Sequence, residues 1–246
     1  MTAAVLNLAA IGDLHVTRKS QGALQPIFAQ AGERADVLLL AGDLTDYGLP
    51  EEAHTLVHEL GRPRIPVIAV LGNHDFESNQ QDEVRRILID GGVTVLDGET
   101  TEVGEVGFVG VKGFCGGFGR RTLEPWGEPS IKEFVREAVN EGLKLESGLA
   151  KLRTRRRVAL LHYAPIAATV EGEPPEIFPF LGSSRLEEPL NRYAVAAVIH
   201  GHAHRGVPEG QTRDGIPVYN VAMPLLRRLN PDGPHFRLIA IPLDGE

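Results

Sequence analysis

Carboxylate, amide and imidazole side chains stand directly after five short apolar runs of this sequence. These groups supply oxygen and nitrogen atoms but no thiolate, so they suit Mn²⁺, Fe, Zn²⁺ or Co²⁺ better than Ca²⁺ or a structural thiolate zinc site. The set is too large for one tetrahedral ion and fits two ions, which a shared carboxylate would hold about 3.5–4 Å apart. The candidate metal ligands are Asp13, His15, Asp43, Asn73, His162, His202 and His204.

The apolar runs have the length and composition of β-strands, and amphipathic segments separate the early ones. Alternation of strands and helices in the first part of the chain indicates parallel pairing, whereas residues 93–114 indicate a hairpin or antiparallel strands. The sequence therefore predicts an α/β sandwich with mixed sheets, and ligands gather at the carboxyl ends of strands in such folds. Strands are expected over residues 6–11, 37–41, 66–71, 93–96, 106–111, 158–161, 195–199, 218–221 and 236–241, and helices over 22–34, 51–60, 81–89 and 131–152.

Composition indicates an ordinary globular protein rather than a membrane or secreted one. A length of 246 residues with 42% hydrophobic side chains suits a single domain over residues 1–246. The longest apolar runs are too short to cross a membrane, and the first residues lack the basic segment of a signal peptide. A single cysteine, Cys115, excludes an internal disulfide. We therefore expect no membrane association and a cytoplasmic location; the oligomeric state stays open.

Charge argues against long nucleic acids as partners. The formal net charge is −8 and the sequence pI is about 5.6, whereas tracking a phosphate backbone needs a basic surface. The basic run at residues 153–157 is interpreted as a solvated helix end before a strand that begins at Val158. Bound metal ions can still supply local positive charge for a small phosphate ester.

The order of the polar motifs resembles that of the calcineurin-like metallophosphoesterase family. The family pattern is D-x-H, G-D, G-N-H-D or G-N-H-E, a lone H, and G-H-x-H, and all five blocks occur here between Asp13 and His204. The resemblance implies a four-layer α-β-β-α sandwich with two mixed sheets and a metal site at the carboxyl ends of the strands. It also implies a hydrolase that acts on phosphate ester bonds with two divalent metal ions, Mn²⁺ being favoured.

The resemblance further implies a role for each motif residue. One metal would be bound by Asp13, His15 and His204, the other by Asn73, His162 and His202, and Asp43 would bridge them. His74 would protonate the leaving group or stabilise the transition state, and Asp75 would orient His74 through a hydrogen bond. A hydroxide held between the metals would attack the phosphorus of a small or medium organic phosphate ester.

Two motifs are also similar to the cyclic-nucleotide phosphodiesterase branch of the family, namely G-D-L-T-D at residues 42–46 and G-N-H-D at residues 72–75. That branch carries His-His-Pro-Pro at the fourth block, where this chain has His162, Tyr163, Ala164 and Pro165. The two matching motifs favour a phosphodiester substrate, whereas the different fourth block argues against a commitment to cyclic nucleotides. A phosphomonoesterase, including a protein phosphatase, a nuclease and a metal-containing scaffold without turnover stay open as alternatives.

Two segments look like cap or specificity insertions, near residues 113–152 and 170–184. The first begins with a glycine-rich stretch that contains Arg120 and Arg121, which are candidates for contacting a substrate phosphate. The second is rich in proline and acidic residues, and long loops of this kind often border binding sites. His200, at the end of an apolar run, is expected to be a core histidine or to support the ligands.

Overall fold

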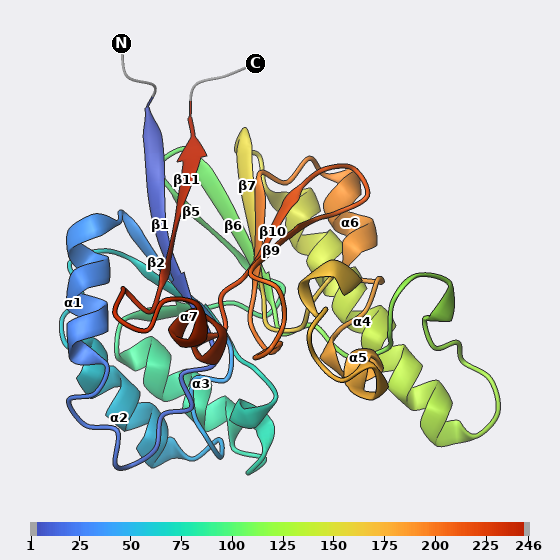
Figure 1. Ribbon diagram of the computed structural model, residues 1–246, viewed down its shortest axis with the longest axis horizontal. Helices are drawn as coiled ribbons and strands as arrows, with labels where there is room; N and C mark the ends of the chain where they lie inside the picture. The colour runs from blue at the N-terminus through green and yellow to red at the C-terminus, as the bar shows by residue number, and fades with distance from the viewer. Residues whose placement is uncertain (1–3, 244–246) are drawn as a thin grey trace.

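Two β-sheets lie face to face, and their parallel strands end at the same edge of the molecule (Figure 1). The computed structural model describes residues 4–243. The first sheet has the order β11-β1-β2-β3-β4. Strands β1 to β4 are parallel, and β11 pairs antiparallel with β1. The strands are β1 (Val5–Ile11), β2 (Val37–Ala41), β3 (Val67–Val70), β4 (Val93–Val95) and β11 (Arg237–Pro242).

The second sheet has the order β5-β6-β7-β8-β10-β9. Its four inner strands are parallel, and β5 and β9 are antiparallel edge strands. Both sheets are thus mixed. The strands are β5 (Thr100–Val103), β6 (Val106–Val111), β7 (Arg156–Leu161), β8 (Ala197–His200), β9 (Glu209–Gln211) and β10 (Pro217–Asn220).

Helices cover the outer face of each sheet (Figure 1). The first sheet is covered by α1 (Gln25–Arg34), α2 (Pro50–Leu60) and α3 (Gln81–Asp90). The second is covered by α4 (Pro129–Lys151) and α6 (Glu187–Arg192). Short helices lie beyond the strand ends, namely α5 (Phe178–Leu181), α7 (Met223–Leu229) and the 3₁₀ turns η1 (His74–Phe76), η2 (Gly119–Arg121), η3 (Ala167–Thr169) and η4 (Pro175–Ile177).

Buried apolar side chains fill each of the three interfaces between the four layers. Leu8, Ile68 and Phe108 belong to the cluster between the sheets, while Phe28 belongs to the cluster under α1 to α3 and Leu145 to the cluster under α4. A strand that is buried on both faces needs no alternation of polar and apolar residues, which explains the continuous apolar runs of the sequence. The expected four-layer α-β-β-α sandwich is confirmed.

The structure corrects several expected elements. The antiparallel pairing expected within residues 93–114 is confirmed by β5 and β6, although no range was predicted for β5. β9 was not expected, because this short edge strand carries no apolar pattern. The helix expected over residues 131–152 is found as α4, which ends at Lys151. The basic run at residues 153–157 is therefore not a helix end, and β7 already begins within it, at Arg156, where it pairs with Val106 of β6. The expectation of one domain over residues 1–246 includes residues 1–3 and 244–246, which lie outside the described part of the chain.

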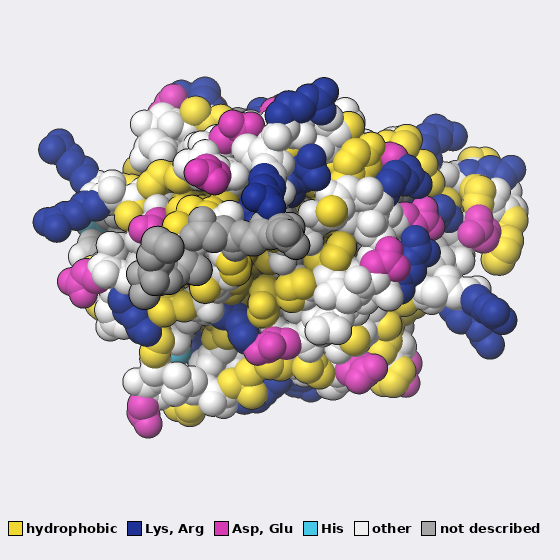
Figure 2. Space-filling view, turned by 90° about the horizontal axis from the view of Figure 1, so that it is seen from above, with side chains coloured by type: hydrophobic (Ala, Val, Ile, Leu, Met, Phe, Trp, Pro, Cys, Tyr) yellow, Lys and Arg dark blue, Asp and Glu magenta, His cyan; other side chains and the backbone are white. Residues whose placement is uncertain are grey.

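The surface at the end where the two termini lie mixes side chains of both signs (Figure 2). Lysine and arginine side chains are spread around this face, between acidic ones, rather than gathered into one stripe. Within residues 4–243, no helix has both the length and the apolar character that a membrane crossing requires.

Candidate metal centre

The candidate ligands lie just beyond the carboxyl ends of neighbouring strands. Asp13, Asp43 and Asn73 follow β1, β2 and β3 in the first sheet, and His162 and His202 follow β7 and β8 in the second. Because these strands are parallel and end at one edge, the loops after them meet between the two sheets. The sandwich therefore converts residues that are far apart in sequence into one cluster.

Three groups of side chains among the described residues have ligand atoms close enough to hold a metal ion, and two of them consist of candidate ligands alone. The third, His15, Asp46 and His74, shares His15 with the first of these. The atoms within each group lie within 4.8 Å of one another. The amide of Asn73 joins the second group, since its Oδ1 is 2.9 Å from Nε2 of His162. The first ligand group is Asp13, His15 and His204, and the second ligand group is Asp43, His162 and His202.

The carboxylate of Asp43 faces both ligand groups. Its Oδ1 is 3.3 Å from Nε2 of His162, and its Oδ2 is 3.9 Å from Nε2 of His15. Oδ1 also accepts a hydrogen bond of 2.9 Å from the backbone N–H of His74. This arrangement, with one oxygen directed to each group, is that of a carboxylate able to bridge two ions.

In two of the ligand histidines, one ring nitrogen donates to a backbone carbonyl outside the centre and the other is left for a metal ion. Nδ1 of His162 donates to the carbonyl of Ala41 at 2.9 Å, and Nε2 of His202 donates to the carbonyl of Phe180 at 3.1 Å, since a carbonyl can only accept. Each ring therefore keeps one lone pair for a metal, as outer partners do in known metal sites.

Burial keeps the second ligand group ready to bind cations. It lowers the pKa of His162 well below its usual value and that of His202 to about 3, so both rings are neutral at pH 7. Burial, together with the carboxylates of Asp13 and Asp75, raises the pKa of Asp43 to about 9. A cation between these groups would relieve both effects, because metal ligands must be deprotonated.

Unsatisfied lone pairs also indicate cations. With Nδ1 of His162 protonated, its bare Nε2 faces two oxygens, Oδ1 of Asn73 and Oδ1 of Asp43. Nε2 of His15 is buried and has no hydrogen-bond partner among the described residues. Buried polar atoms are otherwise almost always paired. The donor set therefore fits two divalent metal ions.

The backbone at the ligands is held in an unusual conformation. Asp13, His15, Asp43 and His202 have φ angles of 55°, 45°, 48° and 69°, which side chains other than glycine rarely adopt. Such strain is typical of functional sites. It shows that the surrounding sandwich, rather than local preference, fixes these four side chains.

Gly72, before Asn73 in the third motif, makes room for the ligands. A Cβ atom on Gly72 would lie 2.2 Å from the backbone nitrogen and from Oδ1 of Asp43. Likewise, a Cβ atom on Gly201 would lie 2.3 Å from Oδ2 of Asp13. The glycines in these motifs thus allow two strand ends to touch.

The structure corrects the expected partner of His74. The carboxylate of Asp75 accepts hydrogen bonds from the backbone of Leu44, Thr45 and Gly72 and from the hydroxyl of Thr45, at 2.6–3.2 Å. Nδ1 of His74 instead donates to the carbonyl of Asp46 at 2.7 Å. Asp75 is fully buried and joins the loops after β2 and β3, so it positions the backbone around His74 rather than the ring.

Asp46 contacts a candidate ligand, although the sequence did not place it among the site residues. Its Oδ1 is 3.3 Å from Nδ1 of His15, which directs Nε2 of that ring towards the first ligand group. The signal was present in the G-D-L-T-D motif, whose second aspartate lies three residues after Asp43. His200 is buried as expected, and its Nε2 is 2.8 Å from Oγ1 of Thr169.

The two expected insertions lie against each other beside the second ligand group. The backbone of Gly117 pairs with that of Ser183 in an isolated bridge, and the N–H of Gly119 donates to Oγ of Ser184 at 2.9 Å. Here we call residues 113–128 and 170–185 the cap. Its α5 contacts the centre through the carbonyl of Phe180, which accepts from His202.

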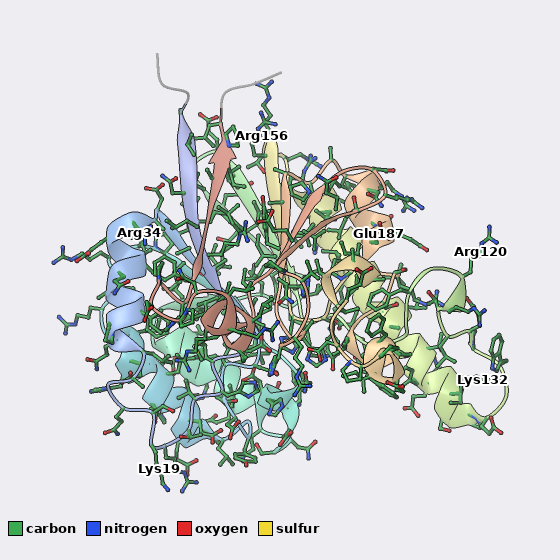
Figure 3. All side chains as sticks on the ribbon, viewed as in Figure 1. Lys19, Arg34, Arg120, Lys132, Arg156 and Glu187 are labelled. Atoms are coloured by element: carbon green, nitrogen blue, oxygen red, sulfur yellow. The ribbon has the colours of Figure 1, made fainter. Side chains whose placement is uncertain are left out.

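Arg120 and Arg121 are not brought to the ligand groups. Both are exposed on η2, and Arg120 points outward from the projecting loop of the cap (Figure 3). The expected phosphate contact from these residues therefore has no support in the geometry. The direction of a side chain on a long loop cannot be predicted from the sequence alone.

Lys112 is a cation beside the centre that sequence reasoning missed. It follows β6 directly, and its backbone carbonyl accepts from the N–H groups of His162 and Tyr163 at 3.1 Å. The rule that found the ligands, a polar residue immediately after a buried strand, applies equally to Lys112. Lys112 was missed because lysine is not a metal ligand and only ligand types were considered.

Comparisons with known proteins identify the family. The model of the family described as calcineurin-like phosphoesterase matches residues 6–206, which include all candidate ligands. No protein among the curated sequences matches the chain.

Several solved structures share the fold. The phosphopantetheinyl hydrolase PptH from Mycobacterium tuberculosis is 18% identical with a TM-score of 0.68 over 95% of each chain. The TT1561 protein of Thermus thermophilus is 15% identical with a TM-score of 0.63, over 98% of this chain and all (100%) of that one. GAP50, described as the anchor in the inner membrane complex of Plasmodium, is 16% identical with a TM-score of 0.54, over 89% of this chain and 72% of that one.

At such identities the solved structures establish the fold alone. The family model does more, because it spans most of the sequence and contains every motif that builds the two ligand groups. The chain belongs to the calcineurin-like phosphoesterase family and is a hydrolase of phosphate esters.

Proposed function

We propose that this enzyme hydrolyses a small or medium organic phosphate ester, with phosphodiesters favoured, at a centre of two divalent metal ions. The observation that carries the proposal is the position of Asp43, whose two carboxylate oxygens are directed to different ligand groups. A buried carboxylate in that position would be costly without cations, because three acidic side chains lie close together there.

The residues of the centre divide into two sets around Asp43. Bound metals would lower the pKa of water towards neutrality and offset charge on the phosphoryl oxygens. Carboxylate, amide and imidazole ligands favour Mn²⁺, with Fe, Zn²⁺ and Co²⁺ as further candidates. One ion would be held by Asp13, His15 and His204, the other by Asn73, His162 and His202, and both by Asp43.

His74 would act as the general acid. Its ring lies edge-on to that of His15, with 4.5 Å between ring centroids, so it borders the first ligand group. Because Nδ1 donates to the carbonyl of Asp46, Nε2 is the nitrogen that can give a proton to the departing oxygen. The side chain of His74 is 32% exposed, so a substrate can reach it.

The preference for diesters rests on the motifs of the second and third blocks, which are similar to those of the cyclic-nucleotide branch. Tyr163 departs from that branch, and its ring packs on His202 with 4.5 Å between centroids. Substitution at this position changes the wall of the site rather than the ligand set. Diester hydrolysis is therefore proposed without a commitment to cyclic nucleotides.

A scaffold that binds metal without turnover is the rival from another class. The fold is shared with a protein described as an anchor, so the fold alone does not decide. The complete ligand set together with His74 favours catalysis, because an anchor needs no acid beside its metals.

The test uses metal-stripped protein and two chromogenic substrates, bis(4-nitrophenyl) phosphate and 4-nitrophenyl phosphate. We expect hydrolysis that depends on added Mn²⁺, with the diester hydrolysed faster. A faster monoester would reverse the proposed preference and favour a phosphomonoesterase. No rate with either substrate, despite two bound metals, would favour the scaffold.

A further inference from the structure

We propose that a cavity beside the His74 turn is a subsite for the leaving group, and that it selects phosphate esters whose alcohol part carries a second anionic group. This subsite rests on the proposed function and adds a substrate class to it. The cavity has a volume of about 160 Å³, and its walls include Leu71, Phe76, Arg85 and Lys112.

One wall of the cavity belongs to the segment that carries Asn73 and His74, although these two residues do not themselves line the cavity. Leu71 lies two residues before the ligand Asn73, and Phe76 lies two residues after His74. The same short turn therefore forms one wall of the cavity and carries both a metal ligand and the general acid. A group that leaves with the proton of His74 would depart on this side.

Lys112 places a positive charge in the cavity; Glu141 and Glu137 act on this charge from a distance, but neither forms an ion pair with it. Its Nζ lies 5.4 Å, 5.0 Å and 5.4 Å from the ring centroids of Phe76, Phe114 and Tyr163. Nζ donates one hydrogen bond of 2.9 Å, to the carbonyl of Gly113. No ion pair of Lys112 is found within residues 4–243, and an ammonium group has three donors, so donors remain for a ligand.

The aromatic rings around Lys112 connect it to the metal centre. Tyr163 contacts Lys112 and also lies 4.5 Å from His202 and 5.4 Å from His162, measured between ring centroids. Phe76 approaches the same ammonium group from the His74 turn. The cation is thus located between the second ligand group and the turn of the general acid.

Arg85 supplies a second cation with a spare donor. Its Nη2 pairs with Glu99 at 2.8 Å, but its Nε is buried and has no hydrogen-bond partner among the described residues. Two carboxylates also line the cavity, and Asp97 is already paired with Lys144 at 2.9 Å. Asp82, in the first turn of α3, is the other.

This combination fits an anionic group on the alcohol part of the substrate. A carboxylate or second phosphate would accept charge-assisted hydrogen bonds from Lys112 and Arg85, which are stronger than neutral ones. Phe76, 37% exposed, offers an apolar face for the rest of the leaving group. An uncharged alcohol part would make no such bonds with Lys112 and Arg85, so the subsite would select esters with an anionic alcohol part over esters without one.

The test compares phenyl phosphate with 4-carboxyphenyl phosphate, and the methyl diesters of the same two phenols, at saturating Mn²⁺. In the Lys112→Met variant we expect kcat/KM for the carboxylated ester to fall about 10- to 100-fold, as for a lost hydrogen bond to a charged group. For the ester with an uncharged phenyl group we expect little change, because its leaving group makes no charged contact with Lys112. Lys112→Arg, which keeps the charge, should retain the preference.

Lys151→Met is the matched control, since it removes an exposed lysine at the far end of α4. It should change neither ester. Equal losses on both esters in Lys112→Met, or no loss on either, would overturn the subsite. Metal content is measured in each variant, so that a loss of metal is not mistaken for a loss of selectivity.

A binding experiment separates this subsite from the proposed function. Phenol and 4-hydroxybenzoate, the two leaving groups, are titrated onto metal-loaded protein and followed by NMR. We expect tighter binding of 4-hydroxybenzoate, and loss of that preference in Lys112→Met. If wild-type protein shows no preference, the subsite is refuted even when esters are hydrolysed; if the preference exists without hydrolysis, only the proposed function fails.

Discussion

The metal centre and the cap lie side by side, but the chain builds them in different ways. Ligands of the centre follow the strand ends closely, and three of the seven are buried: Asp13 and His162 are 0% exposed and Asp43 is 1% exposed. The other four are half-buried. The cap consists of loops and short helices and exposes large apolar side chains, such as Trp126 at 65% and Phe180 at 57%. The sandwich thus fixes the chemistry, whereas the cap can vary without disturbing it.

Among the described residues, the cap reaches a ligand side chain through one hydrogen bond, and its other contacts here are with residues beside the ligands, such as Ala164 and Arg205. The carbonyl of Phe180 accepts from Nε2 of His202, and this is where the cap reaches a ligand. The other ligands are held by the sandwich itself, through the carbonyl of Ala41 for His162 and the carboxylate of Asp46 for His15. Changes in the centre should therefore affect metal binding and turnover, and changes in the cap should affect substrate binding.

The largest effect is expected for Asp43→Asn. The amide keeps the shape of the side chain but removes the charge that two cations would share, so at least one metal should be lost and activity should fall to the metal-free background. Metal content and Mn²⁺-dependent hydrolysis measure this. Asp214→Asn, at an exposed position, is the control. Retention of two metals by Asp43→Asn would refute the bridging role.

His74→Ala should reduce kcat next most strongly. Loss of a general acid lowers rates by about 10²–10⁴-fold, while the ligand atoms within both groups stay in place. Steady-state kinetics and metal analysis are performed on the same sample. If the variant loses metal together with activity, His74 is a ligand, as its proximity to His15 and Asp46 would then explain.

The sequence predicts the centre better than the cap for a physical reason. A buried parallel strand fixes the direction of the residue after it, so the apolar run at residues 37–41 already determines at which edge of the sheet Asp43 lies. The direction of a side chain on a long loop depends on distant contacts, such as the bridge between Gly117 and Ser183. The loop that carries Arg120 could therefore be recognised, but the outward direction of its side chain could not.

Sequence reasoning also failed inside the centre where a contact runs through the backbone. The pairing of His74 with the carbonyl of Asp46 rather than with Asp75 involves no side-chain type that a motif could record. The edge strand β9 was missed because its three residues, Glu209–Gln211, include no apolar side chain. The partner of His74 and the pairing of β9 are both decided by tertiary contacts, which residue types do not determine.

Asp46→Asn sharpens the comparison, because Asp46 supports a ligand without belonging to the expected set. It should weaken metal affinity about 10- to 100-fold, as changes of outer partners do in other metal sites. Metal titration by calorimetry gives the affinity, and kcat at saturating Mn²⁺ should fall less. Glu51→Gln, at the exposed start of α2, is the control. An unchanged affinity would mean that His15 needs no orienting acceptor.

The pH dependence of stability provides a test without turnover. Folding raises the pKa of Asp43 from 3.8 to about 9, so between these values the folded, metal-free protein binds a proton that the unfolded chain does not. Its stability should therefore fall as pH rises through this window. Metals replace the proton, so the increase in Tm on adding Mn²⁺ should grow from about pH 5 to about pH 8.

Calorimetric melting of metal-free and Mn²⁺-loaded protein at several pH values measures this dependence. In metal-free Asp43→Asn, the fall in stability with pH should become shallower, because the titrating group is gone. If the Mn²⁺-induced increase in Tm is independent of pH, Asp43 does not titrate with the expected raised pKa.

The smallest effect is expected for Ser184→Ala in the cap. The change removes the hydrogen bond from the N–H of Gly119 to Oγ of Ser184, which joins the two cap segments at an exposed position. Loss of one such bond is worth about 0.5–1.5 kcal/mol, so KM should rise about two- to tenfold while kcat and metal content stay unchanged. Ser147→Ala, exposed on α4, is the control. A loss of metal in Ser184→Ala would break the comparison, because the cap would then support His202 through Phe180 rather than only contact the substrate.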